Sequence, residues 1–130
     1  MLALERLSAT RIAASRAALD AARWPAGTLV LRTAPDEVVV IAHDAGGVGD
    51  AVADAHAIVE PETGLFGAWM PRAEAARRLD RHSAWDWRRH DGGLAQGAVA
   101  GLPLAIWLGA DRVLWVVPEP FAADFQARLS

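Results

Sequence analysis

Three pairs of short runs rich in valine, isoleucine and leucine, separated by alanine- and arginine-rich stretches, constrain the fold of this chain most strongly. The clearest pair is residues 28–33 and 37–42, which flank a turn containing Pro35 and Asp36. β-Branched residues favour strands, and proline and aspartate favour tight turns, so this pattern predicts a β-hairpin. The other pairs are residues 56–60 with 65–70, and residues 94–100 with 104–108, followed by a further run at 112–117.

Helical patterns lie around these pairs. Residues 2–23 are rich in alanine with regularly spaced charges, and the Pro25 and Gly27 that follow oppose a longer helix. Shorter helices are predicted to end near residue 55, to span residues 72–81, and to follow residues 118–120, where Phe121, Phe125 and Leu129 recur at every fourth position. The chain is therefore predicted to be a single α+β domain of residues 1–130. Its N-terminal helix (1–24) and its β-pairs and helices (28–129) would form one antiparallel sheet of three β-pairs with helices packed on it.

Composition excludes several kinds of chemistry. The chain has 130 residues, 53% of them hydrophobic, which is enough apolar material for the core of one domain. It contains no cysteine and no lysine, which excludes disulfides, thiolate nucleophiles and Schiff-base lysines. The net charge of −3 gives no general attraction to nucleic acid or to a membrane surface. No apolar stretch is long enough for a signal peptide or a membrane span, so we expect a cytoplasmic protein without a membrane partner.

One loop has some phosphate-binding character. Residues 44–50 follow a predicted strand and are rich in glycine, so that backbone N–H groups could hold a phosphate there. The dinucleotide fingerprint, however, would require a glycine where Val52 stands, and two aspartates place negative charge in the loop. A flexible connection is the favoured interpretation. The candidate residues for a small ligand are Arg32, Asp44, Gly47 and Gly49.

No catalytic residue and no metal site is predicted. The four histidines lack the spacing of metal ligands, and no serine stands in a Gly-x-Ser-x-Gly context. Pairs of carboxylates such as Glu60 and Glu62 fall in predicted turns, where acidic residues are common. We therefore expect the chain to bind no cofactor of its own.

Arginine and tryptophan are concentrated between residues 72 and 89. Both residue types dominate the binding energy of protein interfaces, and together they can also hold phosphates and stack on bases. Neighbouring acidic residues such as Glu74 and Asp80 weaken the case for nucleic acid, so a larger protein subunit or a second copy is the favoured partner. The candidate interface residues are Arg77, Arg78, Arg81, Trp85, Trp87, Arg88 and Arg89.

Three segments resemble the gamma subunit of heterotetrameric sarcosine oxidase and, more distantly, the folate-binding fold of aminomethyltransferases. The first is the hairpin of residues 28–42 with its Pro-Asp-Glu turn. The second is residues 67–79 with the following Trp85-Asp86-Trp87, although the His-Pro expected after this point is missing. The third comprises residues 101–107, 113–117 and 121–125.

The resemblance implies a non-catalytic accessory subunit that binds a partner protein, with flavin, NAD and folate held by the larger subunits of the complex. Two alternatives remain open. One is a separate folate-like ligand-binding domain or minor enzyme, in which Arg32 or Arg88 would hold a carboxylate. The other is a nucleic-acid-binding protein that uses the stretch from Arg72 to Arg89.

Overall fold

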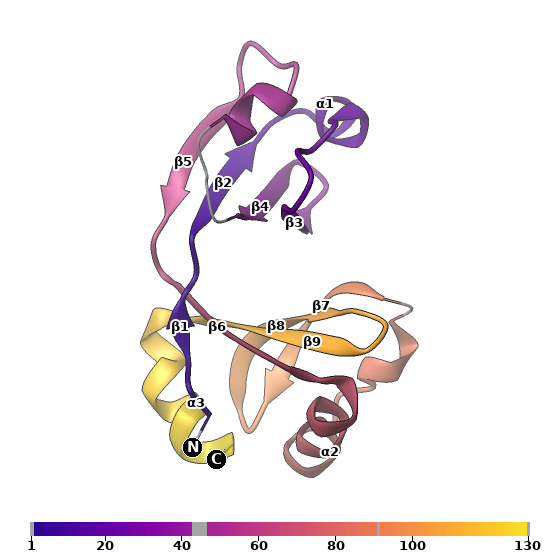
Figure 1. Cartoon of the computed structure of the whole chain (residues 1–130), viewed down its shortest axis with the longest axis vertical. Helices are drawn as coiled ribbons and strands as arrows, with labels where there is room; N and C mark the ends of the chain where they lie inside the picture. Colours follow the sequence, from indigo (N-terminus) through magenta and orange to yellow (C-terminus); the bar gives the residue numbers. More distant parts are fainter. Residues whose placement is uncertain (1, 43–46, 91, 130) are drawn as a thin grey trace. The chain divides into compact units, whose positions relative to one another are not determined.

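The strands of this protein form two separate antiparallel sheets, one in each of two compact units. The computed structural model describes residues 2–42, 47–90 and 92–129 (Figure 1). Unit 1 takes Met1–Arg6 and Gly64–Ser130, and unit 2 takes Leu7–Thr63. The α+β class predicted from the sequence is confirmed. The single sheet of three β-pairs, however, is replaced by a five-stranded and a four-stranded sheet.

Unit 1 is a five-stranded sheet with helices on one face (Figure 1). The strand order is β1-β6-β9-β8-β7, and every neighbouring pair is antiparallel. The strands are β1 (Glu5–Arg6), β6 (Leu65–Pro71), β7 (Gly93–Val99), β8 (Leu102–Leu108) and β9 (Arg112–Pro118). The helices are α2 (Arg72–His82) and α3 (Ala122–Leu129), with short 3-10 turns η2 (Trp87–Arg89) and η3 (Glu119–Phe121).

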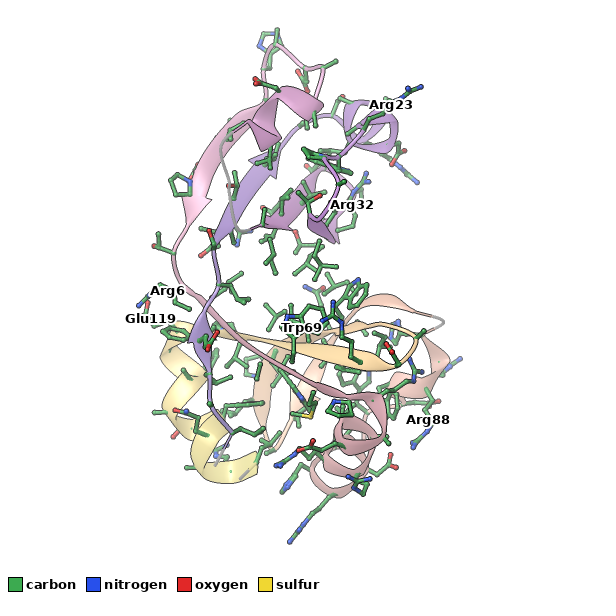
Figure 2. All side chains as sticks on the ribbon, in the orientation of Figure 1. Arg6, Arg23, Arg32, Trp69, Arg88 and Glu119 are labelled. Carbon is green, nitrogen blue, oxygen red and sulfur yellow. The ribbon has the colours of Figure 1, made fainter. Side chains whose placement is uncertain are left out.

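The core of unit 1 lies between this sheet and its helices. Trp115 in β9 is fully buried, its Nε1 donates to Met70 Sδ at 3.0 Å, and its ring lies 5.4 Å from that of Phe125. Alternate residues of a strand point to the same face, so Val113 and Val117 join Trp115 in this core. At the sheet edge, Arg6 forms a 3.0 Å ion pair with Glu119 (Figure 2), which ties β1 to the start of the C-terminal helix.

Unit 2 is a four-stranded sheet in the order β3-β4-β2-β5. Its elements are β2 (Ala9–Ala13), α1 (Arg16–Ala21), β3 (Leu29–Ala34), β4 (Glu37–Ile41), the 3-10 turn η1 (Val48–Ala51) and β5 (Ile58–Glu62). Its buried cluster joins the sheet to α1 and η1 through Ile12, Leu19, Val38, Val40, Val48 and Val52. An ion-pair cluster links three strands, since Arg11 in β2 bonds Glu37 in β4 at 2.6 Å and Glu62 in β5 at 2.7 Å.

The predicted N-terminal helix over residues 1–24 is wrong. Residues 5–6 and 9–13 are strands, and the helix is confined to Arg16–Ala21, capped by the Ser15 side chain, which accepts from the Ala18 N–H at 3.1 Å. Residues 9–13 are strand β2, which pairs with β4 on one side and β5 on the other. A central strand gains two ladders of hydrogen bonds, and this outweighs the modest helix preference of alanine.

The second predicted β-pair is also wrong, because its two runs do not pair with each other. Strand β5 pairs with β2 in unit 2, and β6 pairs with β1 and β9 in unit 1, so residues 63–64 connect the units instead of closing a hairpin. The short helix expected near residue 55 is the earlier 3-10 turn Val48–Ala51. The other predicted elements are confirmed. They are the first and third β-pairs, the strand at residues 112–117, and the helices at residues 72–81 and after residue 120. Among the described residues, no helix has the length and apolar character needed to cross a membrane.

Candidate interaction site on helix α2

Helix α2 divides its side chains between the core and the solvent. Ala75 and Leu79, four residues apart, are fully buried against the sheet of unit 1. This spacing places them on one face of the helix, and Arg77 and Arg81, also four residues apart, are both exposed. The pattern explains why an arginine-rich segment forms a stable helix, since a narrow alanine and leucine stripe is sufficient to pack it.

Arg78 connects α2 to the end of α3. Its Nη1 donates to the carbonyl oxygen of Leu129, and its Nη2 donates to Glu74 Oε1 at 3.1 Å. The Nε atom of Arg78 is buried and has no hydrogen-bond partner among the described residues. Because the last carbonyls of a helix lack partners within the helix, this arginine satisfies one of them and attaches α2 to the end of α3.

A hollow of about 390 Å³ lies between α2 and the end of α3. Its lining consists of Glu74, Arg77, Arg78, Arg81, His82 and Leu129. The lining therefore carries three guanidinium groups against one carboxylate, and Leu129 is its one apolar side chain. Carboxylate or phosphate oxygens are the groups that such a set of arginines binds best.

The segment after α2 is held by an ion pair. Arg88 donates through Nη1 and Nη2 to the two oxygens of Asp80, at 2.5 Å and 2.7 Å, and its guanidinium lies 4.4 Å from the Trp87 ring centre (Figure 2). The hydrogen bonds from Arg88 lower the pKa of Asp80, and the same bonds raise the pKa of Arg88. Arg89 contacts Asp86 at 3.7 Å, with both side chains mostly exposed. Arg88 therefore serves this local structure and is already engaged.

The two tryptophans predicted at the interface belong largely to the interior of unit 1. Trp87 is 4% exposed, and Trp85 is half-buried against Gly97 of β7. Of the seven predicted interface residues, Arg77 and Arg81 are exposed, and their side chains have no ion pair or hydrogen bond within the described part of the chain. Of the candidate set, they are the residues that the fold leaves available to another molecule.

The predicted small-ligand residues serve the local structure of unit 2. Arg32 forms a 3.0 Å ion pair with Asp20 and donates to the carbonyl oxygens of Ala34 and Pro35 (Figure 2). Gly47 has a φ of +82° and begins η1, and Gly49 lies in the same turn, where an added Cβ would be 3.2 Å from Val59. Asp44 lies outside the described residues. The structure thus gives Arg32 a role in holding the β3–β4 turn.

Two features were not singled out by the sequence. Glu74, His82 and Leu129 complete the hollow, and only the packing of α3 against α2 brings Leu129 there. Trp69 is 44% exposed, with Trp107 at 5.7 Å between ring centres and the Arg112 guanidinium 4.0 Å from its ring. The alternation of β6 could have indicated that Trp69 points away from the helix-covered face. Within the described ranges, no group of three histidine or acidic side chains could hold a metal ion.

Comparison with known proteins supports the fold. No protein-family model matches the sequence, and no curated protein is significantly similar to it. Among solved structures, a chain of the heterotetrameric sarcosine oxidase from Corynebacterium sp. U-96, determined in complex with pyrrole 2-carboxylate, matches with a TM-score of 0.68 and 19% identity. The match covers 94% of this chain and 78% of that chain. The predicted resemblance to a subunit of heterotetrameric sarcosine oxidase is thus confirmed at the level of the fold.

Proposed function

We propose that this chain is a non-catalytic accessory subunit that binds a larger partner protein in a flavoprotein complex of the sarcosine oxidase type. The supporting observation is the fold shared, over 94% of the chain, with a protein from a heterotetrameric enzyme. A chain of that kind would contribute a binding surface, and its binding would stabilise the partner by mass action. Flavin, NAD and folate would then be bound by the partner.

The charged groups of the chain are consistent with this proposal. Perturbed pKa values tend to gather at catalytic sites. Here the groups with a shifted pKa each take part in a local contact. Asp54, for example, accepts from the backbone N–H groups of Ser15 and His56, which lower its pKa. Burial lowers the pKa of Arg11, but the hydrogen bonds and charges of Glu62 and Glu37 outweigh burial and raise it. Within the described residues, these groups hold elements together, and none of them lines the hollow between α2 and α3.

The test is purification of the tagged full chain from its native host, followed by size-exclusion chromatography with light scattering and flavin absorbance. The proposal expects the chain to elute in fixed stoichiometry with a larger flavin-containing protein. Elution as a monomer or homo-oligomer without flavin absorbance would contradict it. The two alternatives remain predictions: stabilisation of the isolated chain by folates would favour a ligand-binding domain, and salt-dependent binding of single strands would favour a nucleic-acid-binding protein.

A further inference from the structure

We infer that the hollow between α2 and α3 binds an acidic segment of the partner protein, with Arg77 and Arg81 as the two contacting residues. This inference rests on the proposed function, and it adds the surface and the chemistry of the partner. The sequence offered seven interface candidates. In the described part of the chain, the side chains of Arg77 and Arg81 are exposed and have no ion pair, whereas the other five candidates are buried or make contacts within unit 1.

The spacing of the two arginines is the first argument. Residues four apart on a helix have their Cβ atoms about 5–6 Å from each other, and like charges in this arrangement destabilise the helix. Arg77 and Arg81 are in this arrangement, and the described structure supplies no carboxylate to either of them. Glu74, the one acidic residue in the lining, is already paired with Arg78. Within the residues that the structure describes, this repulsion is not compensated, and an external anion would relieve it.

The composition of the hollow indicates the class of anion. Pockets for small molecules and cofactors are lined mainly by apolar and aromatic side chains, whereas this lining has one apolar residue, Leu129. The volume of about 390 Å³ also exceeds what a single inorganic phosphate would fill. Guanidinium groups bind carboxylates in a two-point geometry, so two acidic side chains one helical turn apart on a partner would match Arg77 and Arg81.

The surrounding charges favour a protein over a nucleic acid. Binding of a nucleic-acid backbone needs a continuous basic stripe. Among the described residues, Arg72 of α2 lies outside the hollow and donates to the carbonyl oxygen of Gly109. Asp80 is exposed on the same helix, and Asp86 follows it closely. A small positive site bordered by carboxylates suits a short acidic segment with basic neighbours.

The absence of lysine from the chain allows a direct test. The variant Arg77→Lys/Arg81→Lys introduces two side-chain amines into a protein that has none. A carbodiimide joins such amines to carboxylates in direct contact, and mass spectrometry of the purified complex identifies the linked residues. The matched control is Arg16→Lys/Arg23→Lys, which introduces two amines at exposed positions of unit 2. We expect links from positions 77 and 81 to aspartate or glutamate of the partner, with few from the control, and loss of these links at about 0.5 M salt.

A second pair of variants measures the strength of the contact. Arg77→Glu/Arg81→Glu and the control Arg16→Glu/Arg23→Glu change the net charge equally. Circular dichroism first checks that both fold. We expect the first to weaken partner binding at least about tenfold and the control to leave it within about twofold. If the unaltered chain binds a partner but the two variants bind it equally well, this inference fails and the proposed function stands. If the unaltered chain binds no larger protein, both this inference and the proposed function fail. If the chain instead binds a single-stranded oligonucleotide through these arginines, the ligand of the hollow is a nucleic acid and not an acidic protein segment.

Discussion

The indole of Trp85 lies against the backbone of Gly97, so closely that an ideal Cβ added to this glycine would be 2.4 Å from Trp85 Cδ2. Ser83 holds this arrangement, since its hydroxyl donates to the carbonyl of Ala98 at 3.2 Å and accepts from the Trp85 N–H at 2.9 Å. The segment after α2 is thereby attached to β7. Trp85 therefore has a structural role that accounts for its position without a partner.

The first prediction concerns this contact. Gly97→Ala usually stabilises a strand, because it reduces the entropy of the unfolded chain. Here the added methyl group would collide with the indole, and we expect it to lower the free energy of unfolding by about 1–3 kcal/mol. Urea denaturation followed by circular dichroism measures the change.

The control for this prediction is the same substitution in a Trp85→Ala background. With the indole removed, Gly97→Ala should cost less than about 0.5 kcal/mol or should stabilise the protein, so that the two sites show a strong coupling energy. An equal loss of stability in both backgrounds would show that the indole does not occupy this position.

The sequence predicted local structure well and long-range pairing poorly. The hairpin at residues 28–42 and the helix at 72–81 were predictable because turn residues and the spacing of apolar residues determine them locally. Residues 9–13 were not, since their alanines favour a helix and their strand depends on β4 and β5, which come later in the chain. The alternation of Thr10 and Ile12, both β-branched, was the available signal for a strand.

The candidate site shows the same limit. The exposure of Arg77 and Arg81 follows from helical periodicity around Ala75 and Leu79, so that part of the site could be read from the sequence. The burial of Trp87 could not, because it depends on how η2 packs under the sheet. The turn between β7 and β8 was also hard to predict, because it contains Ala100-Gly101 where a turn of this type usually has Asn-Gly.

The second prediction concerns the Arg11 cluster in unit 2. Arg11→Met would leave Glu37 and Glu62 without the cation that both now contact, at 2.6 Å and 2.7 Å. We expect a loss of about 1–2 kcal/mol in the free energy of unfolding, below the value for a fully buried pair. The expected loss is smaller than for a fully buried pair because the Arg11 side chain is 35% exposed. Arg16→Met serves as the control, since its 3.9 Å contact with Asp20 is largely exposed and should contribute less than about 0.5 kcal/mol. Comparable losses in the two variants would contradict the central role of Arg11.

The third prediction is a pKa measured by NMR titration of side-chain carboxyl groups. The hydrogen bonds from Arg88 lower the pKa of Asp80 below its ordinary value of 3.8. The stabilisation that this pair contributes is therefore complete above the ordinary pKa and is lost as the pH falls through the lowered one. Arg88→Gln should raise the Asp80 pKa towards 3.8, whereas Arg89→Gln, which removes the neighbouring contact with Asp86, should leave it unchanged. An Asp80 pKa that does not respond to Arg88→Gln would refute the pairing.

The fourth prediction concerns the two-residue turn between β7 and β8. Val99 pairs with Leu102, and the two residues between them have positive φ angles, +52° at Ala100 and +79° at Gly101, as a type I′ turn requires. Alanine is strained there, whereas asparagine adopts this conformation readily, so Ala100→Asn should raise the free energy of unfolding by about 0.5–1 kcal/mol. The contacts of residue 100 with His82 and Arg128 use its backbone N–H and carbonyl, and both survive the substitution.

Two further variants serve as controls. Ala100→Val should be destabilising, and Ala110→Asn, in an exposed turn without a positive φ, should give no gain in stability. Equal urea midpoints for the Asn and Val variants at position 100 would show that the left-handed conformation is absent.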